Sequence, residues 1–175
     1  FPTRRSSDLV AAMFGELGAS CLDVDRVARE IVRSGSPVLA EIGRVLGAEY
    51  LLPDGGLDRR KLGPRVFSDP AALELLNKIT HPVLVREVSE WIAELGADEN
   101  PPPAAIIDAA VLFESGLAEL AHVVVVVAAS ERVQAERIAA RDGIRAEEAL
   151  ARVRAQTPVE EMLKRADFVI RTDCS

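Results

Sequence analysis

Two acidic residues and one arginine with the spacing of a catalytic site lie in the stretch LDVDRVAR, residues 22–29. A short apolar run ends at Asp23, and a helical pattern with Asp25 at or near its N-cap follows. Both carboxylates are therefore predicted at the carboxyl edge of a parallel sheet, where ligands bind in α/β folds. Asp25 could accept a proton from a substrate hydroxyl, and Arg29, one turn later, could bind an anionic group on the same side. The alternative is that Asp25 only caps the helix and that Arg29 is a surface charge.

A second group of charged residues lies in SERVQAERIAARDGIRAEEALARVRAQTP, residues 130–158. Arg137 and Arg141 are four residues apart on one predicted helix, and further arginines follow beyond the Asp142-Gly143 turn, at Arg145, Arg152 and Arg154. Arginines around such a turn suit a lid that closes on polyphosphate and neutralises charge on a transferred phosphoryl group. The alternative is a solvated helical face on which glutamates pair with these arginines.

Two further residues could belong to a site. Asp108 ends the apolar run AIID, where a carboxylate could help to position hydrated Mg²⁺, although a turn-capping role fits its position equally well. His81 precedes Pro82 at the start of a predicted helix, and a histidine there usually caps or bridges nearby backbone. The sequence contains no cluster with metal-ligand spacing, no G-x-S-x-G segment and no dinucleotide-binding fingerprint.

The elements that must position these residues alternate between strands and helices. Strands are predicted at 20–23, 104–108, 122–128 and 167–172, and helices at 10–17, 25–35, 36–47, 58–67, 68–79, 82–96, 130–141, 145–156 and 158–165. The strands are apolar runs rich in β-branched residues, which is typical of a buried parallel sheet. The class is therefore α/β, with a helical insertion between residues 35 and 97 and a proline-rich linker at 98–103.

Composition limits the class of protein further. The chain has 175 residues, 49% of them hydrophobic, and a formal net charge of −7, which argues against a nucleic-acid-binding protein. The longest apolar run is far shorter than a membrane span, and no signal peptide is apparent, so we expect a cytoplasmic protein without a membrane partner. Cys21 lies in an apolar run and is expected to be buried.

These segments, taken in order, resemble the dephospho-CoA kinase family from about Val10 to Ser175. The resemblance rests on LDVDRVAREIVRSGSPVLAEI, DGGLDRRKLGPRVFSDPAALELLNKITHPVL, VLFESGL, ERVQAERIAARDGIRAEEALARVRAQTP and ADFVI. It implies transfer of a phosphoryl group from ATP, with Mg²⁺, to the ribose 3′-hydroxyl of dephospho-CoA. It also implies a P-loop NTPase-like fold, a three-layer structure around a parallel sheet, with a helical substrate-binding insertion and a lid. No obligate protein partner is expected.

The resemblance also implies domains and roles. Residues 10–34 and 104–175 would form the kinase core, with the lid at about 137–156, and residues 35–97 the dephospho-CoA-binding domain. Asp25 would be the base for the 3′-hydroxyl, and Arg137 and Arg141 would contact the ATP phosphates, with Arg141 also acting in catalysis. The substrate-binding residues would be Asp23, Arg29, Asp58, Arg59 and His81.

The chain departs from the family pattern in three places. Ala110-Val111-Leu112 stands where the family usually has Pro-Leu-Leu, and Thr172-Asp173-Cys174 stands where it tends to have Asn-x-Gly. No G-x-x-x-x-G-K-[ST] phosphate-binding loop is present, and residues 1–9, FPTRRSSDL, resemble a translated sequencing-library adapter. We therefore expect residues 1–9 to be an artefactual tail and the chain as written to be inactive or nearly so.

Two other functions fit parts of the sequence. Another P-loop small-molecule kinase would share the core and the lid, although the helical block counts against it. A non-catalytic protein that binds coenzyme A or a nucleotide would explain the lack of the phosphate-binding loop.

Overall fold

A computed structural model describes residues 6–154 and 159–173. The described residues form two compact units, one of residues 18–120 and one of residues 6–17 with 121–154 and 159–173. The boundaries predicted after residues 34 and 103 therefore lie inside the first unit, and the division into a kinase core and a substrate-binding domain stays a prediction. No helix in the described part of the chain is long and apolar enough to cross a membrane.

The first unit contains a pair of parallel strands, as predicted. Strand β1 (Ser20–Asp23) pairs with β2 (Ala105–Asp108) in a register that runs from Ser20 opposite Ala105 to Asp23 opposite Asp108. Helix α2 (Val24–Glu30) follows β1 directly. This tight strand-to-helix turn brings the first turn of α2 to the carboxyl edge of the two strands.

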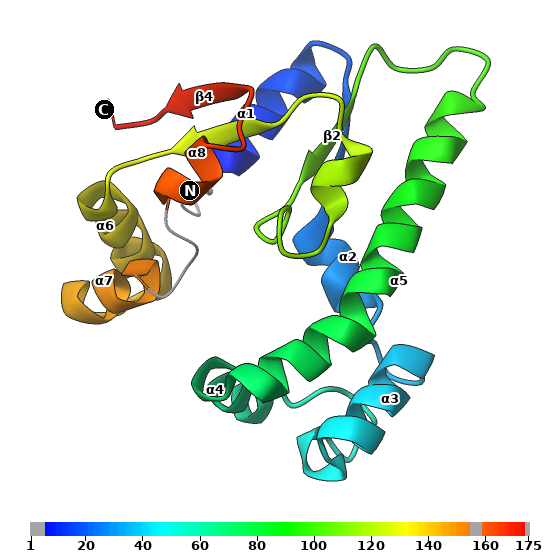
Figure 1. Ribbon diagram of the computed structural model, residues 1–175, viewed down its shortest axis with the longest axis vertical. Helices are drawn as coiled ribbons and strands as arrows, with labels where there is room; N and C mark the ends of the chain where they lie inside the picture. Colours follow the sequence, from blue (N-terminus) through cyan, green and yellow to red (C-terminus); the bar gives the residue numbers. More distant parts are fainter. Residues whose placement is uncertain (1–5, 155–158, 174–175) are drawn as a thin grey trace. The chain divides into compact units, whose positions relative to one another are not determined.

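The remaining elements of this unit are helical. They are α3 (Pro37–Leu46), the 3₁₀ helices η1 (Ala48–Tyr50) and η2 (Leu117–Leu120), α4 (Arg59–Ser68) and α5 (Pro70–Gly96). Figure 1 shows α5 running the length of the unit, with α3 and α4 beside its first half and β2 beside its second half. The side chains of Val24, Ile42, Val88 and Leu117 are almost completely buried in one apolar core, and Trp91 packs against it.

Side-chain caps fix the starts of three helices where the sequence predicted them. Ser36 accepts a hydrogen bond from the backbone N–H of Leu39 at 3.1 Å, and Asp58 accepts one from Lys61 at 3.0 Å. Asp69 caps α5. Such caps satisfy N–H groups that have no partner inside the helix, so a polar residue before an apolar helical pattern is a dependable start signal.

Helix α5 differs from the prediction because the helices expected at 68–79 and 82–96 are one continuous helix through Pro82. The proline nitrogen cannot donate to the Lys78 carbonyl, and an internal proline costs a helix about 3 kcal/mol. Apolar side chains on both sides of Pro82, including Ile79 and Leu84, pack on the same core. Burying each such side chain contributes about 1.5–3 kcal/mol, so burial outweighs the missing hydrogen bond.

Two smaller expectations about β1 and α2 were wrong. Cys21 is exposed, because the described part of β1 pairs only with β2 and Cys21 lies on the face opposite the buried Leu22. Helix α2 ends at Glu30 rather than at residue 35, and its N-cap is Asp23.

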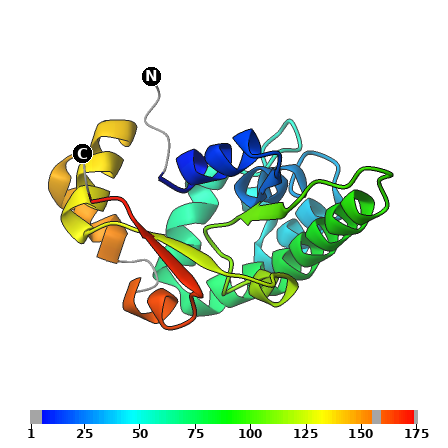
Figure 2. The ribbon, with the colours of Figure 1, turned by 90° about the horizontal axis from the view of Figure 1, so that it is seen from above.

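The second unit contains the other parallel pair, β3 (Val125–Ala128) and β4 (Phe168–Arg171), which lie side by side in Figure 2. Helices α1 (Ser6–Glu16) and α8 (Val159–Leu163) contact β3. Helices α6 (Glu131–Asp142) and α7 (Ala146–Arg154) form a hairpin closed by Gly143, which has a positive φ of 66°. Ala135, Ala149 and Val153 are buried between these two helices. Helix α1 extends into the predicted tail as far as Ser6.

The strands are parallel and alternate with helices, which confirms the α/β class. The described strands form two sheets of two strands each, β1–β2 and β3–β4, rather than one sheet. In the described residues β2 and β3 each have one strand neighbour. The backbone N–H and C=O groups along the other edge of each strand therefore make no ladder hydrogen bonds to a described strand.

Candidate active site

Carboxylates gather at the carboxyl edge of the β1–β2 pair. Asp23 and Asp108 are the last residues of their strands and lie directly opposite each other in the parallel register. Neighbouring strands are about 4.8 Å apart, so both residues belong to one small region. The thiol of Cys21 lies on the same face. Although the residue is exposed, partial loss of contact with water raises the pKa of the thiol, and the negative charge of Asp108 raises it further. The structure thus brings together at this edge two of the residues predicted separately from the sequence.

Asp25 lies in the first turn of α2 and is half-buried, but it is not the N-cap. Capping is performed by Asp23, whose Oδ1 accepts a hydrogen bond from the backbone N–H of Arg26 at 3.1 Å. The alternative that Asp25 only caps the helix is therefore wrong. A negative charge in the first helical turn is favoured by the helix dipole, and this turn lies at the carboxyl edge of the two strands, where ligands bind in α/β folds.

Arg29 lies in the last turn of α2 and is exposed. It is four residues after Asp25, so both side chains project from the same side of the helix. A guanidinium next to the carboxylate edge could hold an anionic group of a ligand whose hydroxyl reaches Asp25.

Asp58 and Arg59 lie at the start of α4. The Asp58 carboxylate is the N-cap, bonded to the Lys61 N–H, and the Lys61 Nζ donates a hydrogen bond to the Glu49 carbonyl at 3.0 Å. These contacts fix the beginning of α4 on the segment around η1. Arg59 is exposed next to this fixed point.

His81 projects from α5 toward the segment that follows β2. It is half-buried, and it is hydrogen-bonded to the backbone of Glu114. Burial lowers the pKa of His81, against the smaller opposing effects of this hydrogen bond and of the Glu114 charge. The contact agrees with the bridging role that the His-Pro sequence suggested, and it ties α5 to the loop behind Asp108.

The predicted ATP-binding arginines lie in the second unit, on α6. Arg137 is half-buried, and its Nη1 and Nη2 donate to the side-chain oxygen and the carbonyl of Thr172 at 3.0 and 2.6 Å. The Asp173 Oδ1 accepts from the Ser130 backbone N–H at 2.5 Å, at the start of α6. The Arg141 side chain lies outside the described part of the structure, as does residue 156 at the end of the predicted lid.

The contacts of Thr172 and Asp173 were missed by sequence reasoning. Their partners are Arg137 on α6 and Ser130 at its N-cap, which are 35 and 43 residues away in the chain, so no local pattern indicates them. The hydrogen bond from Ser130 is the main cause that lowers the pKa of Asp173, and the positive charges of Arg171 and Arg137 lower it further. These bonds attach α6 to the end of β4.

Among the described residues, no group of three or more His, Cys, Asp or Glu side chains could hold a metal ion. Mg²⁺ in kinases is commonly held by only one or two carboxylates together with phosphate oxygens and water. The carboxylate pair at the β1–β2 edge fits that simpler arrangement and not a complete protein cage.

Comparisons with known proteins agree on one family. The family model described as dephospho-CoA kinase matches residues 6–175. A dephospho-CoA kinase from Anaeromyxobacter dehalogenans is 48% identical over 160 residues, which cover 91% of this chain and 75% of the relative. One from Bacillus cereus is 44% identical over 164 residues, which cover 94% of this chain and 81% of the relative.

Two solved structures are similar to this chain in both sequence and fold. A crystal structure of a protein from Thermus thermophilus is 36% identical, with a TM-score of 0.76, over 97% of this chain and 83% of that chain. The dephospho-CoA kinase from Campylobacter jejuni is 30% identical, with a TM-score of 0.62, over 94% of this chain and 81% of that chain.

Proposed function

Because the chain belongs to the dephospho-CoA kinase family, whose reaction is the last step of coenzyme A biosynthesis, we propose that Asp25 is its general base. Asp25 would accept the proton of the ribose 3′-hydroxyl of dephospho-CoA as the hydroxyl oxygen attacks the γ-phosphorus of ATP. The bond from that phosphorus to the bridging oxygen breaks, and ADP leaves. The observation that carries the proposal lies at the start of α2. Asp23 caps the helix and Asp25 does not, so capping does not account for the Asp25 carboxylate.

The proposed acceptor site extends from this carboxylate along the first unit. Arg29, one turn from Asp25, would hold an anionic group of dephospho-CoA. Asp23 would line the site through the carboxylate oxygen that does not cap α2. Arg59 would contribute a second positive charge from a helix start that Asp58 fixes. His81 would act by positioning the loop after β2, because its imidazole contacts Glu114.

The proposed ATP site uses the arginines of α6. Arg141 would contact the phosphates and stabilise the charge that develops during phosphoryl transfer. Arg137 would assist mainly by holding α6 on β4, because two of its donors already bond to Thr172.

Mg²⁺ would supply charge neutralisation at the phosphates when it is bound. Asp108 would help to orient it, since that residue lies at the sheet edge opposite Asp23. The cytoplasmic location predicted from the sequence stays a prediction.

The test is the Asp25→Asn substitution, made in a chain in which a strand and a G-x-x-x-x-G-K-[ST] loop replace residues 1–9, because the chain as written is expected to be inactive or nearly so. The substitution keeps the size of the side chain and removes the base. We expect kcat for dephospho-CoA phosphorylation to fall by about 10²–10⁴-fold, the usual contribution of general acid–base catalysis. The dissociation constant for dephospho-CoA should change by less than threefold. Glu30→Gln is the matched control, because it removes a carboxylate from the exposed last turn of the same helix. An Asp25→Asn enzyme with normal kcat would refute the role of Asp25.

A further inference from the structure

Strand β4 has the features of an edge strand that is open to pairing. In the part of the chain that the structure describes, β3 is its one strand neighbour, and the two lie side by side in Figure 2. Phe168 and Val169 are 63% and 43% exposed. Successive residues point to opposite faces of a strand, so both faces of β4 present an apolar side chain. In β3, by contrast, Val126 and Ala128 are buried, so the exposed apolar surface of this pair is on β4.

The backbone of β4 also presents hydrogen-bonding groups at the edge that faces away from β3, which we call the outer edge. The N–H groups of Phe168 and Thr172 donate to carbonyls of residues 124 and 128 at 3.2 and 2.9 Å. Backbone groups alternate in direction along a strand, so the N–H and C=O groups of Val169 and Arg171 point to the outer edge. A further strand could accept and donate hydrogen bonds there.

The outer edge lacks the devices that usually prevent strand pairing. Native proteins protect an edge strand with proline, with lysine or with a bulge that twists the edge away. The segment 166–173, ADFVIRTD, contains no proline, lysine or glycine. None of its described residues has a positive φ. The outer edge of β4 is therefore a regular template for another strand.

The charges on either side of the apolar residues of β4 are self-complementary. Asp167 directly precedes β4 and Arg171 ends it, and both residues are exposed. In an antiparallel pair of two β4 strands with a two-fold axis at Val169, each Asp167 faces the Arg171 of the other copy. An axis at Ile170 would instead place Asp167 opposite Asp173, and an axis at Arg171 would place two arginines opposite each other. Because opposite charges across a strand pair stabilise it and like charges destabilise it, the charge pattern selects the register centred on Val169.

We propose that β4 pairs antiparallel with the β4 strand of a second copy of this chain, about a two-fold axis at Val169. The two Val169 residues exchange a pair of N–H···O=C hydrogen bonds, because their backbone groups point to the outer edge. On one face Val169 lies opposite its counterpart, between the two pairs of Asp167 with Arg171. On the other face each Phe168 lies opposite the Ile170 of the other copy.

The pairing joins the two β3–β4 pairs into one four-stranded sheet. The same surface is used by both copies, so the contact closes at a dimer and does not continue into a fibre. It involves only unit residues around β4 and is independent of the reaction proposed above.

The contact is small, because each copy contributes only residues 167–171. Interfaces below the standard size are weak and transient, so we expect half-dimerisation at a chain concentration of about 10–100 µM. Each copy carries a net charge of −7, which opposes association at long range. At about 0.15 M salt this repulsion is screened beyond about 8 Å, whereas directly opposed charges still attract.

The first experiment is sedimentation velocity of the full chain at concentrations from about 5 to 500 µM, which bracket the expected midpoint. We expect a monomer–dimer equilibrium without larger species. Val169→Pro removes the N–H that points to the outer edge and leaves the bonds of Phe168 and Thr172 toward β3 in place, so it should raise the dissociation constant at least about tenfold. Arg171→Glu should raise it severalfold, and Arg33→Glu is the matched control because it makes the same charge change at an exposed residue of the other unit.

A cysteine cross-link tests the register. In a Cys21→Ser and Cys174→Ser background, Val169→Cys would place two thiols across a hydrogen-bonded pair whose Cα atoms are about 5.5 Å apart, within the range of a disulfide. Mild oxidation should then give a covalent dimer. Phe168→Cys is the control, because this exposed residue faces Ile170 of the other copy, and it should cross-link at least about fivefold more slowly.

Three results would overturn the proposal. The first is a chain that stays monomeric up to about 500 µM. The second is equal dimerisation of the parent chain and a Val169→Pro chain whose far-UV circular dichroism is unchanged. The third is cross-linking of Phe168→Cys as fast as Val169→Cys, and this comparison decides the question if Val169→Pro does not fold.

Discussion

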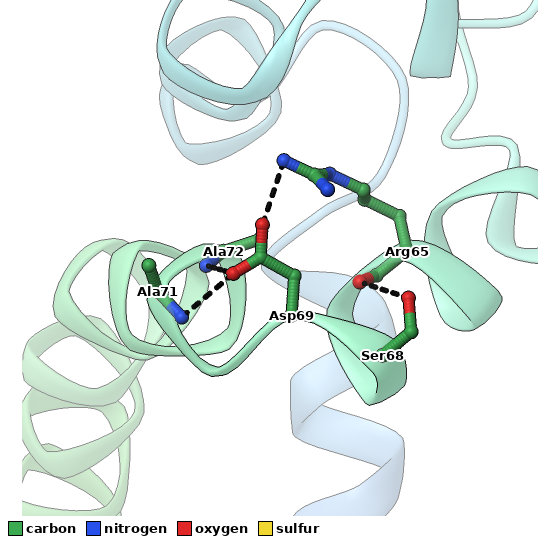
Figure 3. Close-up of polar contacts among 5 residues, drawn as sticks. All are labelled: Arg65, Ser68, Asp69, Ala71 and Ala72. Carbon is green, nitrogen blue, oxygen red and sulfur yellow. Dashed lines mark hydrogen bonds and ion pairs between the residues drawn. The ribbon is translucent and has the colours of Figure 1, made fainter.

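The carboxylate of Asp69 joins two helices, and replacing it should separate two contributions to stability. One oxygen caps α5 through Ala71 and Ala72, and the other pairs with Arg65 (Figure 3). Loss of an N-cap costs about 1 kcal/mol. The ion pair is partly exposed, at 52% for Arg65 and 28% for Asp69, so it contributes about 0.5 kcal/mol. Asp69→Ala should therefore lower the free energy of unfolding by about 1.5 kcal/mol.

Two further variants separate the contribution of the N-cap from that of the ion pair. Asp69→Ser keeps a capping oxygen and loses the charge, so it should cost only about 0.5 kcal/mol. Arg65→Gln should cost a similar amount in the parent chain and almost nothing in the Asp69→Ala background, because the partner is already absent.

The assay is urea unfolding followed by far-UV circular dichroism. At a slope of about 2 kcal/mol per molar urea, Asp69→Ala should lower the midpoint by about 0.7 M, and Asp69→Ser by about 0.25 M. Equal midpoints for the alanine and serine variants would show that the capping oxygen contributes nothing. The α4–α5 junction would then not depend on a cap at Asp69.

Two other predictions concern the pH dependence of stability and the attachment of helix α6. Burial lowers the pKa of His81 from its ordinary 6.5, so the folded chain binds fewer protons than the unfolded chain, and stability should fall as pH decreases below about 6.5. His81→Gln, which can still donate to Glu114, should flatten this dependence in thermal melts from neutral to mildly acidic pH, and an unchanged slope would contradict the assignment. Arg137→Lys, which loses the forked contact with Thr172, should speed amide hydrogen exchange in α6 severalfold and leave α5 unaffected, with a smaller effect for Thr172→Val. Equal exchange in α6 of the parent and Arg137→Lys chains would refute the anchoring role.

Local signals in the sequence predicted the features that depend on neighbouring residues. Ser36, Asp58 and Asp69 cap helices because each bonds to an N–H two or three residues later, a distance at which sequence and geometry correspond. The apolar β-branched runs became strands for a similar reason. The carboxyl edge at Asp23 and Asp108 was predictable because parallel strands place their ends together.

Features that depend on distant residues were not predictable in this way. Pro82 favours a helix boundary locally, and only the core packing on both sides of it shows that α5 continues. Asp23, rather than Asp25, became the cap because β1 passes into α2 without a loop. The bond from Arg137 to Thr172 crosses 35 residues, and no spacing rule reaches that far.

The continuity of α5 has a mechanical consequence for the first unit. Its 27 residues form a rod about 40 Å long, and the rod carries α3 and α4 on one half and contacts β2 on the other. The one internal peptide nitrogen without a hydrogen, at Pro82, makes that point the most compliant part of the rod. A bend of about 20° there would swing the 12-residue part before it, residues 70–81 and about 18 Å long, through about 6 Å at its tip. Because Pro82 follows His81 directly, a bend at that point would move α4 farther than it moves the loop that His81 contacts.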